Sequence, residues 1–551
     1  MKIPMDDQKR FQFYMELKEK CDNTREERKK TYQTQRAYFM FGCGPEGVAA
    51  KTVNKIYSHI DQLSGLMYSA ETTRFSIDVP PSVSDLEKIK IKPLIEKLNN
   101  TWHLSNSDLV FNQAMIWAFV YGCMFIKIRI GKGGQIEPYV VEPHDVGVLR
   151  EDVCGIWKQE AFCHHYWVTE SQIETQLKEI EHPRVEAIIK AIKAKPKEAQ
   201  AGMEQMLNRI ETSASQPNVI GNVNMSLDFP SRYRPQVAEK LVEMVELYVW
   251  DTEMGDYQVV TIAEPGVIIF DRALNKMFLR NESPIIQVCP NPAHDYFWGY
   301  SEVDKLIPLQ KMRNERFDQV QHMMNLQARP PKFGSGFQGD VGEIMDTMDS
   351  PNGLVVGEMP GAKLETVSPQ IPDDIFKEIR EIDMMFEEMS GITNVIQGRG
   401  EAGVRSQGHA ANLARLGSSR AKKKALVVED QLEKLATLYL QLIQAYDDET
   451  MRDEKGQEFI AEQFTNNFIV KVDAHSNSPI FQEDQRALAF ELFKAKAIDR
   501  ETLIDLLDVP MKELLKTKLR TKIEPAEAAA AQAQQQAAAA GAKPPRGKGA
   551  K

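Results

Sequence analysis

Glycines in the segment QGRGEAG, residues 397–403, have the spacing of a dinucleotide-binding loop, and the spacing recurs in KFGSGFQGD, residues 332–340. Such a loop needs a β-strand before the glycines and a helix after them, because the pyrophosphate binds at the N-terminus of that helix. An acidic helical segment and the run ITNVIQ precede Gly398, and two prolines precede Gly334. Neither context fits, so we expect flexible loops and no cofactor.

The segment GCGPEGVAAKT, residues 42–52, comes closest to a phosphate-binding P-loop. It departs from that pattern because Lys51 does not directly follow Gly47 and no strand-like run precedes it. The sequence also has no HExxH motif of a zinc protease and no GxSxG motif of a serine hydrolase. These motifs therefore nominate no catalytic residue.

Cys163, His164 and His165 are adjacent and carry atoms that can bind a metal. Adjacent residues on a strand point to opposite faces, and no second cluster completes a set of four ligands. Packing in the core or at the surface is therefore favoured, and we predict no metal site. The six cysteines are scattered without a CxxC pair, which suits reduced thiols better than a disulfide framework.

Two charged sets flank the segment 397–403. The acidic set raises the alternative of a metal-dependent nuclease, but its spread over roughly four helical turns fits a solvated or channel-facing surface better. The basic set is either a solvated face that balances the acidic helix or a group of weak phosphate contacts. The acidic set comprises Asp373, Asp374, Glu378, Glu381, Asp383, Glu387 and Glu388. The basic set comprises Arg399, Arg405, Arg415, Arg420, Lys422, Lys423 and Lys424.

The composition describes a folded protein and argues against broad nucleic-acid binding. The chain has 551 residues, 42% hydrophobic and 27% charged, with a formal net charge of -11. This length predicts about two to four packed regions. Because the acids outnumber the bases, any DNA contact would be local or weak.

The N-terminal sequence MKIPMDDQKRFQFYM has no unbroken apolar core, so we expect no secretion signal. The longest uncharged run, residues 114–126, is shorter than the roughly 20 residues that a membrane helix needs. These features predict a cytosolic location by default and no membrane partner.

Apolar periodicity predicts an α+β chain that is mainly helical. Helices are expected over 6–40, 53–68, 106–126, 301–328, 373–389 and 409–446, the last about 55 Å long, with short helices in 481–522. Strands are expected in FSIDVPPS, within 127–172 and 241–271, in the Gly-rich segment 332–372, and as a pair in 458–475. Residues 196–236 are polar, which predicts a surface excursion. The Ala/Gln-rich end predicts disorder.

Segments of the second half resemble, in order and spacing, the portal proteins of tailed bacteriophages. Residues 295–333 are similar to the first stem helix of that family, with Trp298, Gly299 and Ser301 before it. Residues 381–424 are similar to the second stem helix, an SGI turn, the tunnel loop and the long wing helix. Residues 497–510 are similar to the helical element that leads to the crown. The resemblance covers residues 300–525 well and the N-terminal half loosely.

The resemblance implies a portal-type subunit with a wing, stem helices, a clip, a long tunnel and wing helix and a helical crown. The implied regions are 1–294 wing, 295–328 first stem helix, 329–372 clip, 373–389 second stem helix, 390–408 tunnel loop, 409–474 long wing helix and strands, 475–525 crown, and 526–551 disordered tail.

The resemblance further implies a ring, typically of about twelve subunits, that forms at one capsid vertex. Double-stranded DNA would be packaged and ejected through this head-tail connector. The implied partners are copies of the chain, the DNA, the terminase large subunit, a tail adaptor, and the major capsid and scaffolding proteins. The implied location is the virion, after assembly in the host cytoplasm, and the implied role is structural because the ATPase is the terminase.

Three groups of site residues follow from the resemblance. The DNA-facing tunnel loop comprises Gln397, Gly398, Arg399, Gly400, Glu401, Ala402, Gly403, Val404 and Arg405. The clip, which docks terminase and then the adaptor, comprises Pro331, Lys332, Phe333, Gly334, Phe337 and Gln338. The stem set comprises Gln310, Asn314, Arg316 and Glu381. A nucleotide-dependent DNA-handling enzyme and another head-to-tail structural protein are the alternatives, although adaptors are usually shorter and lack paired stem helices.

Overall fold

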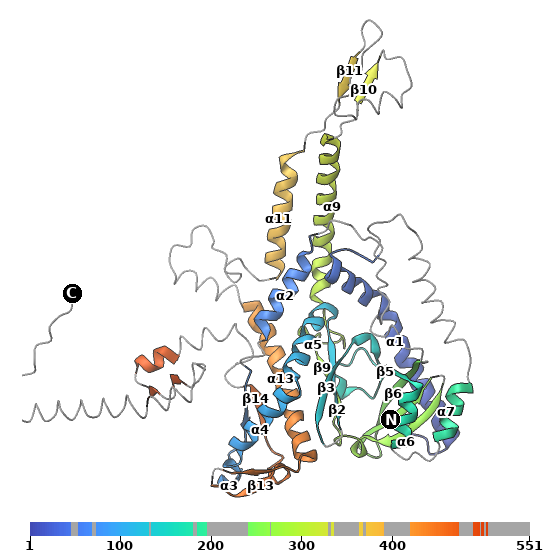
Figure 1. Ribbon diagram of the computed structural model, residues 1–551, viewed down its shortest axis with the longest axis vertical. Helices are drawn as coiled ribbons and strands as arrows, with labels where there is room; N and C mark the ends of the chain where they lie inside the picture. Colours follow the sequence, from blue (N-terminus) through green and yellow to red (C-terminus); the bar gives the residue numbers. More distant parts are fainter. Residues whose placement is uncertain are drawn as a thin grey trace, which may run out of the picture.

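The computed structural model describes residues 1–45, 53–68, 73–131, 134–179, 185–194, 241–264, 266–328, 332–335, 363–366, 371–390, 419–453 and 455–472, and a few residues between 489 and 519. It contains both helices and strands, as the α+β prediction requires. Figure 1 shows a broad body from which two helices project, with a small ribbon of two strands at their far end. No helix within these ranges is both long and apolar enough to cross a membrane.

The centre of the body is an apolar helix, α5 (Ser107–Tyr121), in which Phe111, Met115 and Phe119 are fully buried. It packs against α9 (Glu302–Ala328), against three N-terminal helices and against a three-stranded antiparallel sheet of order β3-β2-β9. The helices are α1 (Asp7–Phe41), α2 (Lys55–Met67) and α4 (Ile91–Leu104). The strands are β2 (Met124–Ile130), β3 (Ile136–Val141) and β9 (Ile285–Val288).

The helix predicted over 106–126 is shorter than expected. It ends at Tyr121 because Gly122 takes a φ of 96°, and strand β2 begins at Met124. A Cβ on residue 122 would lie 2.8 Å from the carbonyl oxygen of Trp298, so this close approach requires glycine. Periodicity could not separate the two elements, since both are buried and almost continuously apolar.

A five-stranded antiparallel sheet of order β4-β5-β6-β7-β8 forms the second layer of the body. Helix α1 covers one face of it, while the main core and helices α6 and α7 cover the other. The strands are β4 (Val146–Val148), β5 (Ala161–Thr169), β6 (Leu241–Asp251), β7 (Asp256–Ala263) and β8 (Val267–Ala273). The helices are α6 (Glu170–Glu179) and α7 (Val185–Ala194). The β-rich segments 127–172 and 241–271 are thereby confirmed.

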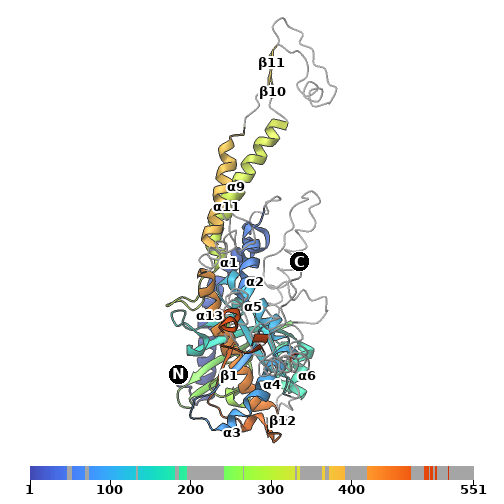
Figure 2. The same ribbon diagram turned by 90° about the vertical axis from the view of Figure 1, so that its left-hand side faces the viewer.

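Two helices, α9 (Glu302–Ala328) and α11 (Asp373–Ser390), run side by side away from the body in both views (Figures 1 and 2). We call this pair the stem. At its far end β10 (Lys332–Ser335) pairs in antiparallel register with β11 (Lys363–Thr366). Both helices match their predicted ranges, and α9 ends before Pro330 and Pro331, as expected.

Helix α13 (Ser419–Tyr446) crosses the body beside α2 and α4, and gives 28 residues of the predicted long helix. The predicted strand pair within 458–475 is wrong in its pairing. Its two runs are strands, but β13 (Glu458–Ile460) pairs with β12 (Thr450–Arg452), and β14 (Ile469–Val472) pairs with β1 (Phe75–Asp78) near the start of the chain. A short helix, α3 (Asp85–Lys88), follows β1.

Several predictions fall on residues outside the described ranges. They are the excursion 196–236, the strand-like run GLVVGEM at 353–359, nearly all of the tunnel loop, residues 409–418 of the long helix, most of the crown and the Ala/Gln-rich tail.

Candidate functional site

The base of the stem is fixed to the N-terminal helices through two side-chain amides of α9. Gln310 is completely buried, and its Nε2 donates to the carbonyl oxygen of Val53 at 3.1 Å and to Oδ1 of Asn314 at 2.8 Å. Its Oε1 accepts from the backbone N–H of Lys55 at 3.0 Å. Asn314 donates through Nδ2 to the carbonyl oxygen of Gly42 at 2.7 Å. These bonds tie α9 to the end of α1 and to the beginning of α2.

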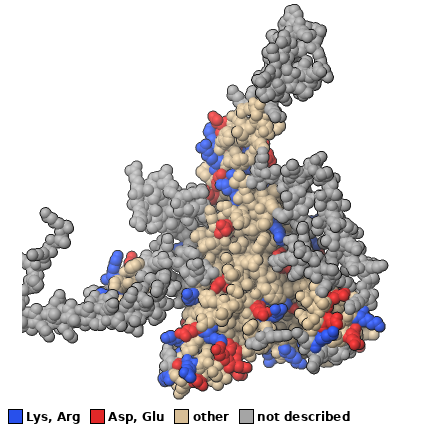
Figure 3. All heavy atoms as spheres, viewed as in Figure 1, with Lys and Arg blue, Asp and Glu red and all other residues tan. Residues whose placement is uncertain are grey.

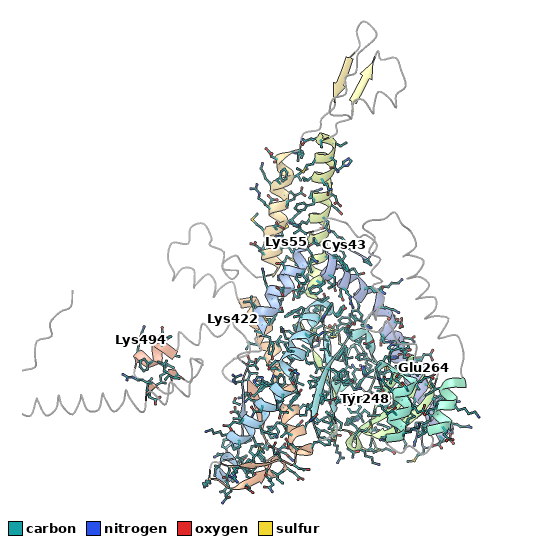
Figure 4. All side chains as sticks on the ribbon, viewed as in Figure 1. Cys43, Lys55, Tyr248, Glu264, Lys422 and Lys494 are labelled. Atoms are coloured by element: carbon teal, nitrogen blue, oxygen red, sulfur yellow. The ribbon has the colours of Figure 1, made fainter. Side chains whose placement is uncertain are left out.

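A charged triad joins the two stem helices to α2. Nε of Arg313 donates to Oδ1 of Asp383 at 2.9 Å, and Nζ of Lys55 lies 3.4 Å from Oδ2 of the same carboxylate. Arg313 also donates through Nη1 to the carbonyl oxygen of Val53 at 3.2 Å, and its guanidinium lies 4.5 Å from the ring centre of Phe317. Figure 4 shows Lys55 where the stem meets the body. One carboxylate therefore links three helices.

The other two predicted stem residues lie on the surface of the stem. Nε of Arg316 is 2.8 Å from Oε2 of Glu378, and this hydrogen bond raises the pKa of Arg316. Glu381 lies one turn further along α11 and is exposed. The structure thus brings Gln310 and Asn314 together, while Arg316 pairs with Glu378 rather than with Glu381.

The first residue of α9 carries a buried carboxylate. Oε1 of Glu302 is 2.6 Å from Nζ of Lys424 on α13 and 3.3 Å from Nζ of Lys305. Burial alone would raise the pKa of Glu302, but the two ammonium groups lower it below its ordinary value. The carboxylate is therefore ionised at neutral pH and holds α13 against the start of the stem.

The chain turns into α9 through the predicted Trp298, Gly299 and Ser301. Trp298 is fully buried, and its Nε1 donates to Oε1 of Glu151 at 2.5 Å. Gly299 has a φ of 67°, and a Cβ there would come within 2.8 Å of a backbone carbonyl oxygen. Ser301 donates through Oγ to the carbonyl oxygen of Val120 at 2.6 Å. This segment is thus built into the core before the stem begins.

The basic set is not a uniform phosphate-binding surface. Lys424 is paired with Glu302, whereas Lys423 is exposed on α13. For Arg420 the structure describes only the backbone, at the start of α13. The remaining arginines, Arg399, Arg405 and Arg415, lie outside the described residues.

The acidic set forms ion pairs rather than a site for two metal ions. Asp374 pairs with Lys377, and Glu378 and Asp383 pair with arginines of α9. Within the ranges that the structure describes, no three of these carboxylates converge on a common point. The nuclease alternative therefore gains no support from the described part of α11.

Among the glycines of these patterns that the structure describes, neither Gly334 nor Gly42 lies between a strand and a helix, as a nucleotide-binding loop requires. Gly334 lies inside β10, opposite Leu364 of β11, and Gly42 ends a helix rather than following a strand. Lys332, Phe333 and Gly334 of the predicted clip lie on this ribbon. The other predicted clip residues, Pro331, Phe337 and Gln338, and the tunnel-loop residues 397–405 lie outside the described ranges.

The stem carries large apolar side chains on its surface. Their exposed fractions lie between 40% and 59%. They are Met312 and Met324 of α9, and Phe376, Met384, Met385 and Met389 of α11. Met324 has an exposed fraction of 56%. Figure 3 shows charges of both signs among uncharged surface on the same projection.

The sequence prediction missed Arg313 and Lys55, although both hold the stem in place. A partial signal existed for Arg313, because it lies three residues after Gln310 and so shares its helix face. No such signal pointed to Lys55, since it lies 328 positions before its partner Asp383 in the sequence.

The sequence matches the family model described as "Phage SU10 portal protein" over residues 120–475, which is more than half of the chain. No curated protein matches it. Among solved structures, a chain of the "Virion of native gene transfer agent (GTA) particle" aligns with a TM-score of 0.40 and 11% identity, covering 87% of this chain and 93% of that one. The matched region includes the three-stranded and five-stranded sheets, the stem and α13. The chain belongs to the SU10 portal protein family.

Proposed function

We propose that this chain assembles with copies of itself into a portal ring, typically of about twelve subunits, at one capsid vertex. Double-stranded DNA passes through the ring during packaging and ejection, and the protein acts as a conduit without catalysis. The observation that carries the proposal is the stem, in which α9 and α11 leave the body together and carry the β10–β11 ribbon at their far end. Such a projection presents two long sides to equivalent helices of neighbouring copies.

The surface of the stem supports contact with identical neighbours. Exposed apolar groups gather on it, and monomeric proteins rarely leave contiguous apolar patches uncovered. Ion pairs already use several of its charges within one subunit. The exposed methionines, among them Met384 and Met385 at 59% and 45%, are therefore the side chains that a neighbouring stem covers.

Weak interaction with DNA fits the charges of the second half. The acidic residues of α11, such as the exposed Glu381, repel phosphates and keep DNA from adhering. The glycines of 397–403 let a tunnel loop adapt to the passing double helix, and Arg399 and Arg405 supply a few phosphate contacts.

The remaining partners are assigned by position along the stem. The ribbon end, with Lys332, Phe333, Gly334 and the flanking Pro331, Phe337 and Gln338, docks the terminase large subunit and later the tail adaptor. The broad body contacts the major capsid protein and, during assembly in the host cytoplasm, the scaffolding protein. The assembled ring is part of the virion.

Ring assembly is tested with the double variant Met384→Glu/Met385→Glu. Charges at these positions are expected to abolish rings in negative-stain images of the chain expressed with its scaffolding protein, and to leave a folded monomer by circular dichroism. Met254→Glu is the matched control, since Met254 is 49% exposed in the turn between β6 and β7. Rings that persist in the double variant, or a wild-type chain that forms none, would contradict the proposal.

The tunnel loop is tested separately from assembly. Deleting residues 398–404 is expected to leave rings intact while DNA packaging or retention falls in a complementation assay. Replacing Arg399 and Arg405 together should likewise change packaging more than folding, because surface substitutions cost little stability. If the deletion destroyed the rings, the loop could not lie in the channel.

A further inference from the structure

A second polar cluster lies between α1 and the five-stranded sheet, away from the stem. Asp22 comes from α1, and Cys163 and His165 come from one face of β5, because residues two apart on a strand point the same way. The two β5 side chains are buried, with exposed fractions of 0% and 3%. Glu264, labelled in Figure 4, lies on this side of the sheet.

The three potential ligand atoms converge on one point. Nε2 of His165 lies 2.6 Å from Oδ1 of Asp22 and 3.5 Å from Sγ of Cys163, and that Sγ lies 3.9 Å from the same Oδ1. Tetrahedral zinc, with bonds of about 2.0 to 2.3 Å, separates its ligand atoms by roughly 3.3 to 3.6 Å. Two of the separations are within about 0.4 Å of that spacing, and only the histidine–aspartate pair must widen, by roughly 0.7 Å.

Neighbouring side chains hold the ligands in orientation. Nδ1 of His165 lies 2.9 Å from Oε1 of Glu243, which leaves Nε2 directed at the cluster. Metal-binding histidines almost always donate their second ring N–H to such an acceptor. Lys18 holds the other oxygen of Asp22 at 3.0 Å and is itself paired with Glu264 at 2.5 Å. The carboxylate oxygen Oδ1 faces the site, and Nε of Arg25 lies 3.8 Å from the same oxygen.

We propose that Asp22, Cys163 and His165 bind one zinc ion, which fastens α1 to the five-stranded sheet. Thiolate and imidazole ligands favour zinc over magnesium or calcium, which prefer oxygen. Cys21, fully buried in the same small core, is a further sulfur donor for the fourth position. The expectation of no metal site considered only the adjacent residues Cys163, His164 and His165, without Asp22 of α1, and this proposal differs from it.

The test uses the full chain after removal of metal with a chelator. Calorimetric titration with zinc is expected to give a stoichiometry of one zinc per chain. The Cys163→Ser variant should weaken binding at least tenfold. Cys154→Ser is the control, since Cys154 lies outside the cluster and hydrogen-bonds to the carbonyl oxygen of Ala293.

A spectroscopic arm needs no variant and so does not depend on a mutant that folds. Cobalt added to the metal-free wild-type chain should give the near-ultraviolet charge-transfer band of a cobalt–thiolate bond. Absence of that band, a stoichiometry well below one zinc per chain, or equal affinity in Cys163→Ser and wild type would overturn the proposal and leave His165 holding only a proton. Ring formation is scored separately, so failure here does not decide the portal function.

Discussion

Arg313 of α9 and Asp383 of α11 form an ion pair across the stem, with 2.9 Å between Nε and Oδ1. The arginine side chain is 6% exposed, and the carboxylate is shared with Lys55 of α2. Both stem helices and the body therefore meet at one carboxylate. This arrangement sets the direction in which the stem leaves the body.

Replacing Asp383 with alanine is expected to lower the free energy of unfolding by about 2 kcal/mol, because a nearly buried guanidinium loses its counter-charge. Urea denaturation followed by circular dichroism measures this. Asp374→Ala on the same helix is the control, since its pair with Lys377 is largely exposed and contributes little. Equal stability of the two variants would show that the pair does not hold the stem.

Replacing Gln310 with leucine is expected to cost about 2 kcal/mol, because the backbone N–H of Lys55 and Oδ1 of Asn314 lose their partner, and the carbonyl of Val53 keeps only its bond from Arg313. Proteolysis should also release the stem more readily from the body. Gln319→Leu is the control on the same helix, because Gln319 is exposed. A Gln310→Leu protein as stable as wild type would mean that these amides contribute nothing net.

Replacing the neighbouring lysines Lys423 and Lys424 of α13 should have different effects on the free energy of unfolding. Lys424→Ala leaves the carboxylate of Glu302, 4% exposed, with only Lys305 beside it, and is expected to cost about 1 to 3 kcal/mol in thermal or urea unfolding. Lys423→Ala should leave stability unchanged, because this side chain is exposed. The prediction fails if both variants unfold at the wild-type midpoint.

The buried His59 is expected to make the free energy of unfolding fall as the pH is lowered. Burial lowers its pKa to about 4, with Glu302 raising it and Lys424 lowering it in smaller measure. The unfolded chain, with an ordinary pKa of about 6.5, binds the proton first, so stability is complete above that pH and falls towards pH 4.

The expected loss between pH 7 and pH 5 is about 2 kcal/mol from this residue alone. The difference in urea midpoints between these two pH values measures the loss. This difference in urea midpoint between the two pH values should be smaller in His59→Gln than in wild type. Carboxylates present in both proteins contribute equally to the two differences and cancel in the comparison. An unchanged pH dependence in that variant would contradict the assignment.

Local periodicity identified the long elements because each buries one face or is buried throughout. The stem helices, α1, α2 and the strands of the two sheets follow this rule. The rule failed at Gly122, where an apolar helix passes directly into an apolar strand, and in 458–475, where two correct strands pair with other partners. Strand partners depend on contacts across hundreds of residues, which periodicity does not encode.

The sequence by itself determined the stem helices, α1, α2 and the two β-rich segments, but not α4, α6 or α7. It also determined the family resemblance carried by residues 295–424 and the candidate stem residues Gln310 and Asn314. Only the tertiary structure decided which charges meet. Asp383 joins Lys55 across 328 positions, Glu302 joins Lys424, and Asp22 reaches Cys163 and His165. Side-chain chemistry follows from residue type, but a site requires ligand atoms within a few ångströms, and the packing of α1, α2, β5, α9, α11 and α13 sets those distances.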